Sequence, residues 1–241
     1  MTLIQGGRTN YGEVLGIIML DTRFPRLQGD VGNAATFPFP VRYQIVTGAS
    51  PVKVVREADP SLIAPFIAAA RDLEAAGVRA ITTSCGFLAL WQQELASAVS
   101  VSLFTSSLLQ VPLVWHMTGR RPVGIITADA KSLTPAHLRA VGADQVPSVI
   151  IGLEGASEFT RTFIEGEPSL NVEAAEAEVR AAARRLKREH PEIGAVVLEC
   201  TNLPPFADVV REETRLGVFD IVTLSHFVVR ALQGHRFPLS L

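Results

Sequence analysis

Two cysteines, Cys85 and Cys200, are the only thiols in this chain of 241 residues. Each follows an apolar run that is typical of a buried strand, and the segments ITTSCGF and VVLECTN align when the two cysteines are superposed. Upstream, residues 16–21 and 124–129 echo each other, because both place an aspartate at the same spacing after Gly-Ile-Ile. The pattern indicates an internal duplication in which each half contributes one thiol.

A thiol at the carboxyl end of a parallel strand is well placed for proton transfer. Ligands collect at these ends, where helix N-termini supply backbone N–H groups. A helix N-terminus also favours the thiolate, so we expect lowered pKa values at Cys85 and Cys200 and general-base chemistry near neutral pH. Packing is the alternative for each cysteine, because cysteine is among the most buried residue types. We expect free thiols rather than a disulfide or a metal site, since no secretion signal is evident and neither thiol lies in a CxxC motif.

Polar residues gather at the same strand ends. Hydroxyls and helix-start amides suit a carboxylate, although Ser or Thr at such a point is also a common N-cap. Asp21 could orient a thiol or bind a substrate ammonium, and a turn role is equally consistent because Asp129 occupies the equivalent position. Glu199 precedes Cys200, but neighbouring side chains of a strand point to opposite faces, so we predict no catalytic role for it. The candidate binding residues from this pattern are Asp21, Thr83, Ser84, Ser106, Ser107, Thr127, Thr201 and Asn202.

Strand-like and helix-like segments alternate along the whole chain. A helix is predicted over residues 61–76, which have apolar residues at helical spacing and end before Gly77, and a longer one over 172–190. Residues 106–119 and 223–233 also have a helical pattern. The predicted strands are 14–20, 42–46, 80–83, 101–104, 123–127, 148–152, 195–198 and 218–221. This alternation predicts an α/β fold with parallel sheets.

The echo between the halves also suggests how the chain divides into domains. We place a first α/β domain at residues 1–110 and a second at 111–221, with the C-terminal segment 222–241 returning to complete the first. Residues 23–40 break the regular alternation, because they combine Pro, Gly and Phe without a clear period. We predict a long loop there that serves as a lid or as a subunit contact.

Composition excludes several classes of function. The chain is 48% hydrophobic and 19% charged with a net charge of −2, so it has no basic excess for nucleic acid. The apolar run from Val14 to Leu20 is too short to span a bilayer, and we expect a cytoplasmic protein without membrane association. The five histidines are scattered, and no HExxH, Walker or dinucleotide motif is present. We therefore predict no metal and no nucleotide cofactor.

Four motifs together resemble the aspartate/glutamate racemase superfamily, which also includes hydantoin racemase, maleate isomerase and arylmalonate decarboxylase. They are TTSCGF, TSSLLQVPL, VGIITADA and LECTNLPP, and the resemblance covers nearly the whole chain. It implies two pseudo-symmetric parallel-sheet αβα domains related by internal duplication, with the active site in the interdomain cleft and no pyridoxal phosphate. It also implies that Cys85 and Cys200 alternate as general base and general acid on the two faces of a stereocentre. The residues that would hold the substrate carboxylate are Thr83, Ser84, Gly86 and Thr201.

Departures from the family pattern narrow the substrate. Gly86-Phe87 follows Cys85 where amino-acid racemases commonly have Asn-Thr, and Asn202 stands where glutamate racemases have His. These residues favour a less polar pocket, closer to the hydantoin racemase and arylmalonate decarboxylase branches. The decarboxylase lacks the first cysteine, so the presence of both thiols favours racemisation or isomerisation.

From these residues we predict a racemase or epimerase of a small carboxylate, such as an amino acid or a hydantoin-like compound, in a homodimer or higher homo-oligomer. The alternatives are a thiol-dependent maleate-type cis–trans isomerase, an arylmalonate-type decarboxylase and a non-enzymatic protein that binds a small anion.

Overall fold

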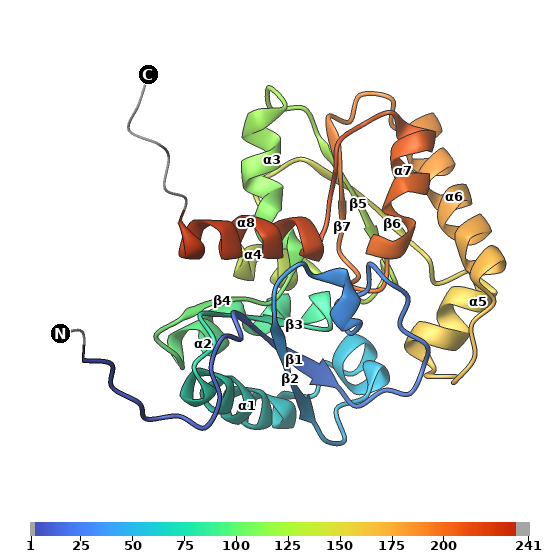
Figure 1. Ribbon diagram of the computed structural model, residues 1–241. Coiled ribbons are helices and arrows are strands. Elements are labelled where there is room, and N and C mark those ends of the chain that lie inside the picture. The colour runs from blue at the N-terminus through green and yellow to red at the C-terminus, as the bar shows by residue number, and fades with distance from the viewer. Residues whose placement is uncertain (1–2, 235–241) are drawn as a thin grey trace.

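The computed structural model describes residues 3–234, which form two α/β halves, one above the other in Figure 1. The termini, including residues 235–241 of the predicted segment 222–241, lie outside the described residues. The strands are β1 (Leu15–Leu20), β2 (Val41–Val46), β3 (Ala80–Thr83), β4 (Ser102–Phe104), β5 (Val123–Thr127), β6 (Ser148–Gly152), β7 (Ala195–Leu198) and β8 (Val218–Phe219). The α-helices are α1 (Ile63–Ala76), α2 (Gln92–Ser97), α3 (Val111–Met117), α4 (Pro135–Ala140), α5 (Ser157–Phe159), α6 (Val172–Glu189), α7 (Ala207–Thr214) and α8 (Ile221–Gln233).

The two sheets have the same strand order. The first runs β2-β1-β3-β4 and the second β6-β5-β7-β8, and every strand pairing in both is parallel. Glycines mark equivalent points of close helix packing: a Cβ on Gly16 of β1 would lie 3.0 Å from Leu73 of α1, and one on Gly124 of β5 would lie 2.8 Å from Leu186 of α6. The predicted α/β fold with two pseudo-symmetric parallel-sheet domains is confirmed.

Strand β1 is buried on both faces. Ile17 belongs to a cluster with Ile221 and Val229 of α8, whereas Ile18 belongs to the cluster that contains Phe66 of α1. Because successive side chains of a strand alternate in direction, α8 and α1 cover opposite faces of the first sheet. The last helix of the described chain therefore packs against the first sheet, while the domain limits at 110/111 and 221/222 stay predictions.

Several sequence-based element limits differ from the structure by one or two residues, and two of the differences are informative. The strand predicted to reach Ile221 ends at Phe219, because the Asp220 side chain accepts a hydrogen bond from the Thr223 N–H at 2.7 Å and caps α8. The helix predicted over residues 106–119 consists of the 3-10 helix η5 (Ser107–Gln110) followed by α3.

The loop at residues 23–40 contacts both halves. It contains one short 3-10 helix, η1 (Ala34–Thr36), and its Phe24 and Phe37 side chains are buried. Phe24 packs edge-on against Phe163 of the π-helical turn η6 (Thr160–Ile164) in the second half, with ring centroids 5.1 Å apart. The aromatic residues that set this loop apart in the sequence thus anchor it between the halves.

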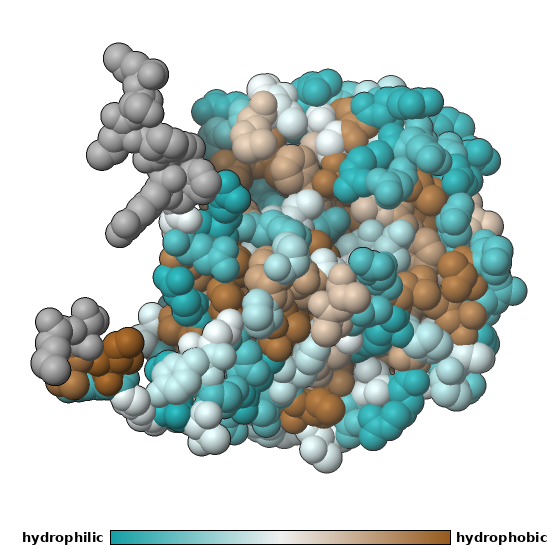
Figure 2. Space-filling view, in the orientation of Figure 1, coloured by the Kyte–Doolittle hydropathy of each residue, from teal (hydrophilic) through white to brown (hydrophobic). Residues whose placement is uncertain are grey.

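The outer surface of α6 and α7 is mainly hydrophilic (Figure 2). Arg180 of α6 pairs with Glu176 at 2.9 Å and with Glu213 of α7 at 2.7 Å, so ion pairs join these two helices. Among the described residues, no helix combines the length and the apolar character needed to cross a membrane.

Candidate active site

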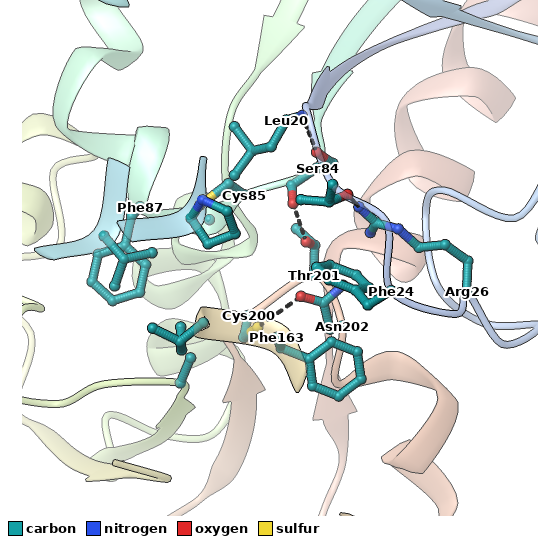
Figure 3. A pocket seen from close by; sticks show the side chains of 16 residues that line it. Leu20, Phe24, Arg26, Ser84, Cys85, Phe87, Phe163, Cys200, Thr201 and Asn202 are labelled. Carbon is teal, nitrogen blue, oxygen red and sulfur yellow. Dashed lines mark hydrogen bonds between the residues drawn. The ribbon is translucent and has the colours of Figure 1, made fainter. Parts of the chain in front are cut away.

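Cys85 and Cys200 line one pocket between the two halves, at the carboxyl ends of β3 and β7 (Figure 3). Cys85 is the N-cap residue of the 3-10 helix η4 (Gly86–Trp91). The two residues are 7% and 9% exposed, and neither is in a disulfide. The space between the side chains that line this pocket is about 360 Å³, a volume that includes its opening to solvent.

Two hydrogen bonds join the carboxyl end of β7 to the first half. The Thr201 hydroxyl donates to the Ser84 carbonyl at 2.7 Å, and the Ser107 hydroxyl donates to the Leu198 carbonyl at 2.6 Å. All four groups are buried, so these bonds fix the carboxyl end of β7 against the first half. The relative position of the two thiols is therefore set by buried contacts.

Four of the residues predicted to bind substrate line the same pocket. They are Ser84, Gly86, Thr201 and Asn202. The hydroxyl groups of the first and third are already engaged, since the Ser84 hydroxyl accepts from the Leu20 N–H at 2.9 Å and Thr201 donates to the Ser84 carbonyl. The Thr201 hydroxyl proton is therefore used within the pocket wall, whereas the Ser84 hydroxyl still has its own proton to donate to a ligand.

Asp21 and Ser106 lie outside the lining of this pocket. The Asp21 carboxylate accepts from Arg23 at 2.7 Å and from the Gly48 N–H at 3.2 Å, which is the turn role that was weighed for it. Ser106 caps η5, because its hydroxyl accepts from the backbone N–H two residues later. Short polar side chains at strand ends act here as caps and turn residues, which their sequence positions alone do not distinguish from ligand contacts.

Thr83, Ser107 and Thr127 are buried beside the pocket rather than in its lining. Thr83 donates to the Thr105 carbonyl at 2.8 Å, and Thr127 donates to the Glu199 carboxylate at 2.7 Å. Each hydroxyl satisfies a buried acceptor, so these residues hold the frame of the site together.

Other lining residues were not predicted from the sequence. Phe24, Arg26 and Phe163 form an aromatic and cationic wall, and the Arg26 guanidinium lies 4.4 Å over the Phe24 ring. Among the described residues, Arg26 is the only cationic side chain that lines this pocket. The aromatic content of residues 23–40 marked this loop as unusual in the sequence. The packing of its Phe24 against Phe163 joins residues that are 139 positions apart, so the sequence did not predict it.

A chain of polar contacts connects this wall to the second thiol. Arg26 donates to Asp30 at 2.8 Å, Asp30 accepts from the Asn202 amide at 2.6 Å, and Asn202 accepts from the Cys200 thiol at 3.6 Å. The Asp30 side chain is 2% exposed, so this ion pair is shielded from water. The loop therefore contributes charge and orientation at Cys200 as well as a cover.

The surroundings of the thiols raise their pKa values, which contradicts the expected lowering. Burial, reinforced by the charge of Glu199, raises the pKa of Cys85 to about 12 and that of Cys200 well above its ordinary value. Backbone N–H groups at the following turns lower both values, as expected for such positions, but only in part. Desolvation of the thiolate outweighs these dipoles because both side chains are almost fully buried.

Comparisons with known proteins agree with this fold. A family model for Asp/Glu/hydantoin racemases matches residues 59–225. The chain is 32% identical over 235 residues to a dimethylsulfoniopropionate lyase of Durusdinium sp. clade D, which covers 94% of this chain and 77% of that protein. It is 30% identical over 238 residues to dimethylsulfoniopropionate lyase 7 of Emiliania huxleyi, covering 94% and 69% of the two chains.

Solved structures show the same fold at low sequence identity. A mutant of arylmalonate decarboxylase, in a form associated with sulfate ion, has a TM-score of 0.63 at 17% identity and covers 92% of this chain and 94% of its own. The resemblance drawn from the four sequence motifs is thereby confirmed. With two related α/β halves, a pocket at the strand ends and a family match over most of its length, the chain belongs to the Asp/Glu/hydantoin racemase family.

Proposed function

We propose that this protein is a thiol-dependent lyase that eliminates dimethyl sulfide from dimethylsulfoniopropionate. The observation that supports this most directly is the pocket itself, in which two thiols face an aromatic and cationic wall. The two relatives named as dimethylsulfoniopropionate lyases, which align with nearly the whole chain, supply the substrate. The proposal keeps the predicted proton abstraction beside a carboxylate and changes the fate of the resulting carbanion.

The reaction needs one base and no acid at the leaving group. A cysteine thiolate removes a proton from the carbon next to the carboxylate, and that C–H electron pair forms the new C=C bond. The bond between the adjacent carbon and sulfur breaks, and its electron pair leaves with the sulfur as neutral dimethyl sulfide. Acrylate is the second product, and the proton on the thiol returns to solvent.

The wall of the pocket suits both ends of this substrate. The ring of Phe163 offers a surface to the sulfonium methyl groups, since aromatic rings attract cations, whereas the Phe24 ring already carries the Arg26 guanidinium on one face. Arg26 uses two N–H donors on Asp30 and Thr22, and a guanidinium has five, so donors remain for the substrate carboxylate. This arrangement orients the carbon chain across the thiols.

The positive charge of the substrate also counteracts the high pKa values of the thiols. A sulfonium cation bound beside a buried thiol favours the thiolate and opposes the desolvation that raises the pKa of Cys85 to about 12. Binding of the substrate cation therefore favours formation of the base.

Racemisation or epimerisation of a small carboxylate is the second candidate, because both thiols line the same pocket. The two reactions share their first step and differ in the need for the second thiol. Elimination requires a single base, whereas racemisation through two thiols requires a base on one face of the carbanion and an acid on the other.

The test is release of dimethyl sulfide from dimethylsulfoniopropionate, measured by gas chromatography for the wild-type protein, Cys85→Ser and Cys200→Ser. We expect a loss of at least about 100-fold in the variant that lacks the base, in line with usual general-base contributions. A parallel incubation in deuterium oxide with amino acids, hydantoins and substituted malonates detects racemisation or decarboxylation. Undiminished release in both variants would reject a thiol base, and no release together with deuterium exchange into an amino acid or hydantoin would favour the racemase.

A further inference from the structure

Glu199 is a fully buried carboxyl group between β7 and Cys200. One of its oxygens, Oε2, accepts a hydrogen bond from the Thr127 hydroxyl at 2.7 Å. The other, Oε1, has no hydrogen-bond partner among the described residues. Burying a carboxylate oxygen without a hydrogen-bond partner lowers the stability of the folded protein, so its presence here needs a physical explanation.

The unpaired oxygen faces the first half of the molecule next to the other thiol. A Cβ atom on Gly86 would lie 2.3 Å from Glu199 Oε1 and 2.2 Å from the Glu199 carbonyl oxygen. Gly86 directly follows Cys85, and Glu199 directly precedes Cys200. The Glu199 carboxyl group therefore lies between the backbone segments that carry the two thiols, although this carboxyl group does not line the pocket.

Its charge acts on both thiols. The negative charge of Glu199 raises the pKa of Cys85 and that of Cys200, in each case as the largest contribution after burial. Burial raises the pKa of Glu199 itself to about 7, while the Thr127 hydrogen bond lowers it in part. Of these three acids, Glu199 is the one that changes its charge near neutral pH.

We propose that Glu199 is a positioning residue that sets the charge of the catalytic thiols: Cys85, Cys200 and Glu199 share a single negative charge, and a thiolate forms only while Glu199 holds a proton. Like charges in one desolvated site cannot all be present, and their titrations are coupled. When a thiol ionises and Glu199 takes up one proton, the charge of the three groups stays at −1. The substrate cation then meets one anion rather than two.

The other charged or titratable groups near the site belong to the loop at residues 23–40 and to α4. Arg26 lowers the pKa of Cys85 and Asp30 raises that of Cys200, but these two residues are paired with each other at 2.8 Å. His137 of α4 packs edge-on against Phe87 of η4, and burial lowers the pKa of this histidine, so it is neutral near pH 7. Glu199 is thus the charge near the thiols that has no ionic partner among the described residues.

The test is the rate of iodoacetamide alkylation of each cysteine between pH 6 and pH 10, followed by mass spectrometry in the absence of substrate. Glu199→Gln keeps the side-chain shape and removes the charge, so we expect both thiols to react about tenfold faster or more near pH 8.5, one pKa unit being a factor of ten. Glu189→Gln, on the exposed end of α6, is the matched control and is expected to leave both rates unchanged. Identical alkylation profiles for the wild type and Glu199→Gln would overturn the proposal.

Thr127→Val provides an independent route if Glu199→Gln does not fold. It preserves the shape of residue 127 and removes the hydrogen bond that favours the charged carboxylate, so Glu199 stays protonated to higher pH. We expect faster alkylation of both cysteines than in the wild type near pH 7.5, and no difference near pH 10, where Glu199 is charged in both proteins. An equal effect at the two pH values would show that Thr127 acts through packing and would overturn the role of Glu199.

This proposal deepens the proposed function and rests on it for the use of a thiolate as base. The alkylation assay uses no substrate, so the two fail separately. A protein that shows the predicted alkylation shift but releases no dimethyl sulfide would retain Glu199 as the residue that sets thiol charge in a different reaction.

Discussion

Replacing Arg26 by methionine separates its structural role from its role in binding. The guanidinium donates to Asp30 at 2.8 Å and to Thr22 at 2.9 Å, and the Asp30 side chain is only 2% exposed. Arg26→Met keeps the length of the side chain but leaves the Asp30 carboxylate buried with only the Asn202 amide and the Gly32 N–H as donors. Removing one partner of a buried ion pair costs about 3–5 kcal/mol, and we expect a loss of that size in the free energy of unfolding.

The double variant Arg26→Met/Asp30→Asn removes both charges, and Asp30→Asn alone is the control for the lost carboxylate beside Asn202. We expect it to be more stable than Arg26→Met by about 1 kcal/mol or more in urea unfolding, although it contains one more substitution, because no unpaired charge stays buried. Its kcat/KM for dimethylsulfoniopropionate should nevertheless fall about 10-fold to 150-fold, the equivalent of one charged hydrogen bond worth about 1.5–3 kcal/mol. A stable double variant with unchanged kcat/KM would refute the binding of the substrate carboxylate by Arg26 and leave it a purely structural residue.

Two further predictions concern the contact between the halves. Gly86→Ala places a Cβ 2.2 Å from the Glu199 carbonyl oxygen, so the two halves must shift apart. We expect the free energy of unfolding, measured in urea, to fall by about 1–3 kcal/mol. An unchanged urea concentration at the midpoint of unfolding would contradict this packing. The second follows from the pKa of Glu199, which burial raises from 4.5 to about 7 in the folded protein. The folded state therefore holds a proton that the unfolded chain releases, and stability falls as pH rises from about 4.5 to about 7, by about 3 kcal/mol at 1.36 kcal/mol per pKa unit. Glu199→Gln should lack this part of the decline, so parallel stability curves for the two proteins would speak against a raised pKa.

The strands were predictable because their signal is local. Buried parallel strands consist of short apolar or β-branched runs, and residues 80–83, 123–127, 148–152 and 195–198 form strands with the limits predicted from sequence. The limit that failed, at Ile221, depends on whether Asp220 ends a strand or caps a helix. Both roles suit aspartate, and only the folded chain distinguishes them.

The sequence predicted the two thiols that line the pocket but not the wall opposite them. The duplication placed Cys85 and Cys200 at equivalent strand ends, and parallel strands bring such ends to one edge of each sheet. Phe24, Arg26 and Phe163 come from a loop and a π-helical turn that have no counterpart in the repeat pattern. No local rule relates such segments, because their contact is decided by packing between the two halves.

The sequence by itself determined the α/β fold, the internal repeat and the placement of two thiols at equivalent strand ends, since these depend on periodicity and on residue types at equivalent positions. Only the tertiary structure decided the charge state of the site. Burial raises the pKa values of the two thiols, which a helix N-terminus was expected to lower. The packing of the two halves also places Glu199 against Gly86 of the other half. Desolvation depends on all the atoms that surround a group in the folded protein, and the residues next to it in the sequence do not determine which atoms these are.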